Sequence, residues 1–350
     1  MTVWYATREQ VKTSVDVKNS LRANASIDRA IADASRSADR LCRRIFYPRL
    51  DTRRWYPSGA VFSGSRQLDD DSPTPGVLWL GGESEIIELV TFTDGGQPVD
   101  LADVFLFPET GPPYTRIEHS PVAALNTTAT AWFGHSDDQE PAGLVATVGG
   151  VSSMDVQMAV TDGSVVGVGA LLSCGDERMI VTEKRATATG LTLAADVAGQ
   201  MNAVTVTLSG TTAAPEPGEM ILIGGERMLV QDRIGTAVYV TRQVDGTVLA
   251  AHLTGAAVHA YRTLTVTRGQ VGTAAAIHLQ GAELTAYVPH PSLNSYVVAE
   301  ALNQVAQENS AYARVIGSGD NQREARGAGL KDKRDRVRRE LGRRVRMGAI

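Results

Sequence analysis

The 350-residue chain has only two cysteines, Cys42 and Cys174, and aromatic residues make up only 5% of it. Two cysteines exclude a disulfide framework, so we expect a reducing compartment and two thiols that act as small buried hydrophobic groups. No segment approaches the roughly 18 consecutive apolar residues of a membrane-spanning helix. Residues 1–10 lack the apolar core and cleavage site of a signal peptide. We therefore expect no membrane partner.

The sequence also lacks the motifs of several enzyme classes. It has no Gly-x4-Gly-Lys-Ser/Thr phosphate loop, no Gly-x-Ser-x-Gly nucleophile elbow and no His-Glu-x-x-His zinc motif. Gly167-Val168-Gly169 lacks the third glycine of a dinucleotide site. A pair of glycosidase carboxylates stays open as an alternative, because such pairs need not be adjacent in sequence. We expect no enzyme activity, no catalytic residue, no cofactor and no metal.

Two groups of polar residues allow a functional and a structural interpretation. Asp69–Asp71 could be part of a calcium loop, but no glycine or glutamate follows at the required spacing, which favours a solvated acidic loop. His252 and His278 occupy equivalent positions of a sequence repeat. A metal-binding or catalytic role is one interpretation, and the repetition favours the other, a structural role in a turn.

The net charge of -5 conceals a strong asymmetry along the chain. Residues 1–56 carry 12 Lys and Arg against 6 Asp and Glu, and residues 323–350 carry 11 against 4. These ends are net +6 and +7, whereas residues 57–322 are net -18. Such asymmetry indicates partners rather than a fold. Basic ends can bind phosphate backbones without reading sequence, or acidic protein surfaces.

The residue pattern predicts helices near both ends of the chain. Thr7–Gln10 fits a capping box that begins a short helix. Apolar residues at spacings of three and four predict a longer helix over 24–47, with five arginines on its other face. A third helix is expected from Ser292, and 323–350 has the narrow apolar stripe of a basic helix that docks on a partner or stays disordered alone.

The middle of the chain has the pattern of strands. Residues 50–135 alternate, with Asp94-Gly95-Gly96 as a hairpin turn. Residues 145–288 contain two repeats, one with an offset of 49 and a shared Gly-x-Glu-Arg-Met core, the other with an offset of 26 and 12 identities in 23 positions. Repeated glycines and Thr/Val alternation predict a small β domain of stacked hairpins.

The order of these elements resembles head-to-tail connector (adaptor) proteins of long-tailed bacteriophages, of the actinobacterial-phage type. The resemblance covers about 1–140 and 289–350, and the repeated β region of about 145 residues interrupts it. Its motifs are two N-terminal helices that lead into Ile45-Phe46-Tyr47, then Thr52-Arg53-Arg54-Trp55-Tyr56, the Pro-Pro-Tyr-x-Arg-Ile-Glu stretch within Phe105–Glu118, Thr130-Ala131-Trp132-Phe133-Gly134, and a final helix followed by Gly317-x-Gly319 and a basic tail.

The resemblance implies an α+β fold with a helical connector core and a small β-sheet. The expected parts are a core over 1–144, an inserted β domain over 145–288, a core helix over 289–322 and a portal-docking tail over 323–350. The implied function is a non-enzymatic ring, of twelve subunits in this family, that lies between the portal protein and the next tail protein. Double-stranded DNA passes through its lumen without sequence readout. The implied location is the virion neck, after assembly in the host cytoplasm.

The implied contacts fall on two basic segments. The candidate portal-docking residues are Arg323, Arg326, Leu330, Lys331, Lys333, Arg334, Val337, Arg338, Arg339, Leu341, Arg343, Arg344, Val345 and Arg346. The candidate residues for the DNA channel or for contacts between ring subunits are Arg29, Arg36, Arg40, Arg43 and Arg44.

Two other classes of function remain open from the sequence. One is a carbohydrate-binding or carbohydrate-degrading tail protein in which the β region is the working part. That region contains only Tyr239, Tyr261 and Tyr287 as aromatic residues and no Trp, which is unfavourable for sugar stacking. The other is a sequence-independent DNA-binding protein, for which binding would depend steeply on salt.

Overall fold

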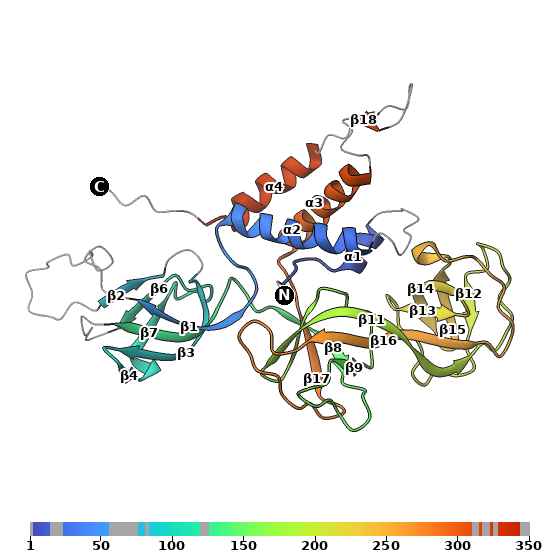
Figure 1. Cartoon of the computed structure of the whole chain (residues 1–350), viewed down its shortest axis with the longest axis horizontal. Helices are drawn as coiled ribbons and strands as arrows, with labels where there is room; N and C mark the ends of the chain where they lie inside the picture. Colours follow the sequence, from blue (N-terminus) through green and yellow to red (C-terminus); the bar gives the residue numbers. More distant parts are fainter. Residues whose placement is uncertain are drawn as a thin grey trace, which may run out of the picture. The chain divides into compact units, whose positions relative to one another are not determined.

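A computed structural model describes residues 3–14, 24–55, 76–80, 84–119, 126–309, 315–316, 323–324 and 328–343. Of these residues, 40% lie in strands and 22% in helices (Figure 1). The prediction of a helical connector core is therefore wrong. The described part of the chain is mainly antiparallel β-structure with four short helices, because the alternating β region buries far more side chains than the helices do.

The four helices lie near the two ends of the chain. They are α1 (Arg8–Thr13), α2 (Asn24–Cys42), α3 (Pro291–Asn309) and α4 (Ala328–Leu341). The capping box that begins α1 is confirmed, because the amides and side chains of Thr7 and Gln10 bond reciprocally at 3.0 and 3.3 Å. Most of the predicted apolar stripe of α2 is buried, namely Ile27, Ala30, Ile31, Ala34, Ala38 and Cys42. Leu41 and Ile45 of the same stripe are half-buried, and the helix ends at Cys42 rather than near residue 47.

Two small sheets share one apolar core. The first has the order β1 (Arg49–Trp55), β7 (Thr127–Phe133), β3 (Ile86–Asp94), β4 (Gln97–Val99). The second has the order β2 (Gly76–Trp79), β6 (Arg116–His119), β5 (Val104–Phe107), with the short 3-10 helix η2 (Leu101–Asp103) before β5. The predicted Asp94-Gly95-Gly96 hairpin is confirmed between β3 and β4. The core contains Leu78, Leu80, Ile86, Phe92, Ile117, Ala129, Ala131 and Phe133.

The β region forms an antiparallel sheet of ten strands. Their order is β12-β15-β14-β13-β16-β11-β10-β17-β8, and β9 pairs with β16. The bounds are β8 (Gln139–Leu144), β9 (Gln157–Ala159), β10 (Leu171–Cys174), β11 (Glu177–Thr192), β12 (Thr205–Thr207), β13 (Met220–Ile223), β14 (Glu226–Ile234), β15 (Ala237–Thr241), β16 (Ala257–Thr267) and β17 (Glu283–Tyr287). The 3-10 helix η3 (Val244–Gly246) follows β15.

This sheet consists of two copies of one six-stranded module, and the second copy is inserted into the first. Module A contains β8, β9, β10, β17, the first half of β11 and the second half of β16. Module B contains β12 to β15, the second half of β11 and the first half of β16. Figure 1 shows β11 and β16 as the two long strands that run through both modules.

The strand registers of the two modules correspond pair by pair. Leu172 pairs with Ala286 in module A as Ile221 pairs with Ala260 in module B. The other equivalent pairs are Met158–Leu264 with Val206–Val238, and Leu144–Glu283 with Thr192–Ala257. An offset of 26 relates one strand of every equivalent pair, and an offset of 48 or 49 relates the other. The two sequence repeats therefore arise from one duplicated module. Module B is inserted into module A, so the equivalent segments before and after the insertion have different offsets.

Each module has its own apolar core, and the cores are built from equivalent positions. Cys174 in module A occupies the position of Ile223 in module B, and both side chains are buried. Burial raises the pKa of the Cys174 thiol. Cys42 is also buried, so the prediction that both cysteines act as small hydrophobic groups is confirmed.

The chain divides into two compact units. The first contains Met1–Ser37 and Gln139–Arg336, and the second contains Ala38–Asp138 and Val337–Ile350. Helix α1 and α2 up to Ser37 therefore belong with the β region, whereas the sequence grouped them with residues up to 144. A further strand pair, β18 (Val315–Ile316) and β19 (Arg323–Glu324), lies in the first unit. None of the described helices has the length and apolar character needed to cross a membrane.

Equivalent turns of the two modules differ at one strained position. Val271 in module A has a φ of 50°, and the equivalent Asp245 in module B has a φ of 57°. Asp and Asn tolerate this left-handed region, whereas a β-branched side chain does not. We predict that Val271→Asn raises the free energy of unfolding by about 1 kcal/mol. Urea denaturation checks this, with Val271→Thr as the β-branched control; equal stability of the two variants would contradict it.

Candidate functional site

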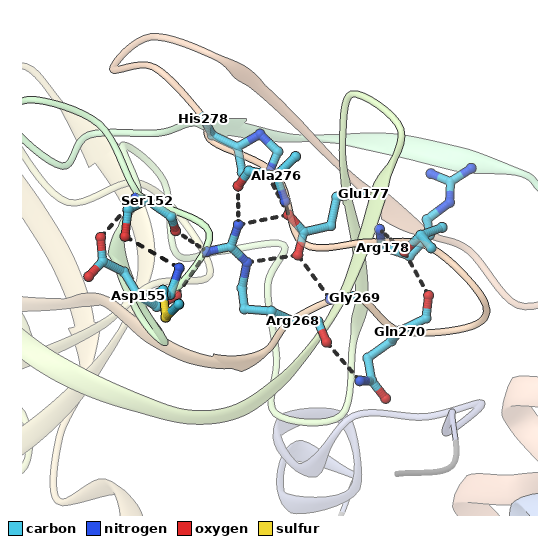
Figure 2. Close-up of polar contacts among 11 residues, drawn as sticks. Ser152, Asp155, Glu177, Arg178, Arg268, Gly269, Gln270, Ala276 and His278 are labelled. Carbon is cyan, nitrogen blue, oxygen red and sulfur yellow. Dashed lines mark hydrogen bonds and ion pairs between the residues drawn. The ribbon is translucent and has the colours of Figure 1, made fainter.

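The most highly connected polar group of module A is a buried carboxylate, Glu177, at the start of β11. Arg268, just after β16, donates from Nε and Nη2 to the two carboxylate oxygens at 2.7 Å each. The amides of Gly269 and Ala276 donate at 2.9 Å, and His278 Nε2 lies 2.7 Å from Oε2. Figure 2 shows these partners around one carboxylate. We call this arrangement the module A clamp.

Module B contains the same arrangement around Glu226, at the start of β14. Arg242 donates to both carboxylate oxygens at 2.8 and 2.6 Å, and His252 Nε2 lies 2.9 Å from Oε2. The amides of Gln243 and Ala250 complete the set at 3.1 and 3.2 Å. This module B clamp therefore reproduces every partner type of the module A clamp, with the same donors on equivalent elements.

Both clamp carboxylates are ionised in the folded chain. Burial opposes their ionisation, but the bonds from the arginine, the histidine and the backbone amides outweigh it. The pKa of Glu177 and that of Glu226 are each lowered to about 2. A bidentate arginine with additional amide donors is the geometry in which a buried ion pair becomes stabilising.

Each clamp arginine also holds a second loop. Arg268 Nη1 donates to the carbonyl oxygens of Ser152 and Asp155 at 2.7 and 2.8 Å (Figure 2). Arg242 Nη1 donates to the carbonyl oxygens of Ala198 and Ala203 at 3.0 and 3.1 Å. Each clamp therefore fixes two neighbouring loops at one end of its module.

The clamps have the chemistry of structural sites. Every donor around Glu177 and Glu226 is directed at the carboxylate, and the side chains of both glutamates are fully buried. The structural interpretation of His252 and His278 agrees with this geometry. Each also pairs through its backbone, His278 with Val151 and His252 with Val197. Among the described residues, no group of three or more His, Cys, Asp or Glu is arranged to hold a metal ion.

Sequence reasoning missed the two glutamates. Each was part of the repeated Gly-x-Glu-Arg-Met pattern, but its partners lie elsewhere, since 91 residues separate Arg268 from Glu177. A usable signal existed: the same acid, arginine and histidine recur in both copies of the duplication. When three charged or polar residue types recur together in repeats that otherwise differ, their side chains are expected to contact one another.

The N-terminal segment is attached to the β region inside the first unit. The Arg8 amide donates to the Val168 carbonyl at 3.0 Å, and Glu9 accepts from the Val168 amide at 2.8 Å. Gly169 is required there, because a Cβ atom would lie 2.1 Å from the Trp4 ring. These contacts explain why the N-terminal helices group with the modules rather than with a separate connector core.

Two of the arginines proposed for a DNA channel or ring interface, one on α2 and one just after it, make internal contacts instead. Arg36 donates to the Val3 carbonyl at 2.7 Å. Arg44 lies 2.9 Å from His135 Nδ1 and 3.4 Å from the buried carboxylate of Glu85. Both side chains therefore stabilise the fold of their own unit.

The other three candidate arginines, two on α2 and one directly after it, face solvent. Arg29 is exposed and pairs with Glu308 of α3 at 2.9 Å. Arg40 and Arg43 are exposed. These three remain candidates for a partner or for DNA.

The predicted docking residues also divide into internal and exposed groups. Val337 and Leu341 are buried, and the Val337 carbonyl lies 4.0 Å from Cys42 Sγ. Leu330 is half-buried. The exposed candidates on α4 are Lys331, Lys333, Arg334, Arg338 and Arg339.

Arg343 is the last described residue of the predicted docking tail, and it is bound to its own unit. Its amide donates to the Cys42 carbonyl at 3.0 Å, its Nη2 donates to the Leu80 carbonyl at 2.7 Å, and its Nε lies 3.9 Å from Glu85. Burial raises the pKa of Glu85, and Arg44 and Arg343 offset this effect only in part. Arg326, Arg344, Val345, Arg346 and Asp69–Asp71 lie outside the described residues, as does the side chain of Arg323.

The fold and the clamps define a chain of mainly antiparallel β-structure whose most connected polar groups stabilise it. No family model matches the chain, and no curated protein or solved structure is significantly similar to it.

Proposed function

We propose that the chain is a structural virion protein of long-tailed bacteriophages. It forms an adaptor ring between the portal and the tail, completes the head and surrounds the exiting DNA. One observation carries this proposal: the sequence motifs that resemble connector proteins lie far apart in the chain but contact one another in the second unit. The proposal no longer includes a helical core, and it places the connector motifs in a β-rich unit.

The first of these contacts joins the segment after α2 to the end of β7. The Gly134 backbone has a φ of 152°, and a Cβ atom there would lie 2.4 Å from the Tyr47 carbonyl oxygen. The amides of His135 and Ser136 donate to the Phe46 carbonyl at 3.2 and 3.3 Å. The Phe-Gly motif and the Ile45-Phe46-Tyr47 motif therefore depend on each other, because only glycine permits this approach.

The second contact joins two more motifs in the same sheet. The Thr52–Trp55 part of its motif lies in β1, which pairs with β7. Thr52 lies opposite Thr130, and their hydroxyl oxygens are 2.8 Å apart. Strand β1, which carries Thr52–Trp55, therefore pairs directly with strand β7, which carries the motif that begins at Thr130.

The Pro-Pro-Tyr-x-Arg-Ile-Glu stretch joins the two sheets. The amide and carbonyl of Tyr114 pair with Ile86 of β3 at 2.7 and 2.9 Å. Ile117 is buried in the shared core. The Arg116 guanidinium lies 4.1 Å from the Phe107 ring centroid and 5.2 Å from that of Trp79. The motifs therefore behave as parts of one folded unit, which supports the resemblance.

Attachment to portal-bearing heads tests the proposal. The heads come from a phage stock that lacks this chain, and the full-length chain is added and measured by co-sedimentation. We predict saturable binding, and at least a tenfold weaker affinity for the α4 variant Arg334→Glu/Arg338→Glu/Arg339→Glu. These side chains are exposed, so charge reversal changes the surface and leaves the fold intact.

A control reverses charge elsewhere on the exposed surface. Arg185→Glu changes an exposed arginine of β11, outside α4 and outside the connector motifs. The proposal expects this variant to attach as the unmodified chain does. Absence of binding by the unmodified chain, or binding only to free DNA, would contradict an adaptor role.

A further inference from the structure

The two modules expose the same apolar side chains at equivalent positions. Met154, Val156 and Leu279 in module A are 89%, 53% and 73% exposed. Their equivalents Met201, Val204 and Leu253 in module B are 55%, 40% and 70% exposed. We call these groups the module A crown and the module B crown. Exposed apolar groups reduce solubility, so their recurrence in both copies indicates a contact surface.

The clamps explain why the crowns protrude. His278 and His252 point inward to the clamp carboxylates, so the next residues, Leu279 and Leu253, point outward. The methionine and valine of each crown lie on the second loop that the clamp arginine holds. Each crown is therefore a rigid, exposed apolar turn, which lowers the entropy cost of binding.

The segments around the crowns carry acidic side chains, and the cations that contact the crown loops are the clamp arginines, which are paired with Glu177 and Glu226. Residues 143–177, 186–215, 243–261 and 269–313 contain no Lys or Arg. Asp155, in the module A crown loop, accepts a bond from the Ser152 amide, and Asp196 in module B accepts one from Thr254. These backbone bonds lower the pKa of each aspartate, so both are ionised. The crowns therefore fit an apolar partner that carries a cation.

The first unit also contains a hollow with the complementary properties. It lies between α1, α3 and α4 and has a volume of about 450 Å³, which is within the range of about 300–1,000 Å³ for binding clefts. Its apolar residues are Val298, Ala299 and Leu302 of α3. Lys333 of α4 lies at its edge and donates to the Ser295 hydroxyl. The rest of the lining is Gln10, Thr13, Ser14 and Asn294.

We propose that the α1–α3–α4 hollow binds a crown of a second copy of this chain. The apolar crown turn covers Val298, Ala299 and Leu302, and the crown aspartate faces Lys333. Both surfaces are open within one copy, and their charges are complementary. The contact joins two different surfaces, so it is head-to-tail, and repeated head-to-tail contacts form a ring when the rotation between copies closes. The inference rests on the proposed ring function and supplies its contact between copies.

Cysteine cross-linking between copies tests the contact. The native cysteines are buried, so disulfides between introduced cysteines can be detected without a background from the native thiols. Full-length Leu302→Cys is mixed with Leu279→Cys or Leu253→Cys under mild oxidation, in solution and on portal-bearing heads. We expect disulfide-linked dimers in at least fivefold excess over a mixture with Ile234→Cys. Ile234 is a matched control because it is 66% exposed in module B and lies outside the crown.

Two charge-reversal variants test the charge complementarity in the same assay. Lys333→Glu lowers the dimer yield at least fivefold, whereas Arg185→Glu, an exposed cation of β11 outside the hollow, leaves it unchanged. Equal yields with Ile234→Cys, or no cross-link with either crown in solution and on heads, would overturn the proposal. If the same chains still attach to the portal, only this contact is rejected; if attachment also fails, the proposed function is rejected with it.

Discussion

Replacement of Glu226 with alanine is expected to lower the free energy of unfolding by about 3–5 kcal/mol, because it leaves the buried Arg242 without its counter-ion. Glu177→Ala should have an effect of similar size, since Arg268 occupies the same position in module A. Urea denaturation followed by circular dichroism measures both. The exposed carboxylate of Asp232, also on β14, provides the matched control.

The same experiment separates a structural clamp from a dispensable surface pair. Asp232→Ala should change stability by no more than about 0.5 kcal/mol, as exposed substitutions usually do. Glu226→Gln keeps the shape of the side chain but loses its charge. Its free energy of unfolding should therefore lie between those of the Asp232→Ala control and Glu226→Ala. A clamp variant as stable as Asp232→Ala would show that the carboxylates contribute nothing to the fold.

Acid is expected to destabilise the chain through the same two residues. Each clamp carboxylate has a pKa of about 2 in the folded chain, against an ordinary value of 4.5. The unfolded chain therefore binds more protons between these values, and stability falls as the pH drops from about 5 to about 2. The shift corresponds to roughly 3 kcal/mol for each clamp.

Urea unfolding at pH 7 and pH 3 measures this loss. Glu226→Gln should lose markedly less stability between the two values than the unmodified chain does, because its clamp no longer titrates. Asp232→Asn, the exposed control, should retain the full loss. An identical pH dependence in all three chains would place the acid sensitivity outside the clamps.

Local sequence signals predicted local structure correctly. The capping box at Thr7, the Asp94-Gly95-Gly96 hairpin and the buried stripe of α2 all depend on residues close together in the chain. The repeats at offsets of 49 and 26 correctly indicated duplicated strands. The sequence did not show that the two repeats belong to one duplication. Strands β11 and β16 each belong to both modules, so segments that pair in the sheet lie far apart in the sequence.

The errors came from long-range contacts and from the resemblance. Amphipathic helix patterns are stronger per residue than the short alternating strands, so the helical share was overestimated. A cationic helix face does not show which arginines find a partner inside the fold. Arg36 and Arg44 do so through Val3, His135 and Glu85. The clamp glutamates were missed because their arginine and histidine partners lie far from them in the sequence.

The duplicated modules give the proposed adaptor a region whose loops are held by internal bonds. Each clamp fixes the loops of its module, and each crown extends from those loops. The clamps thus stabilise the surface that we propose for the contact between copies. Loss of a clamp should affect self-association as well as stability, because the crown is held by the same arginine.

Electron microscopy of portal-bearing heads incubated with the full-length chain tests the central claim most directly. The account predicts additional ring-shaped density below the portal, present with the unmodified chain and strongly reduced with Arg334→Glu/Arg338→Glu/Arg339→Glu. Heads without added density at the portal, or density spread over the capsid shell or along released DNA, would contradict the proposal that this chain is a head-to-tail adaptor.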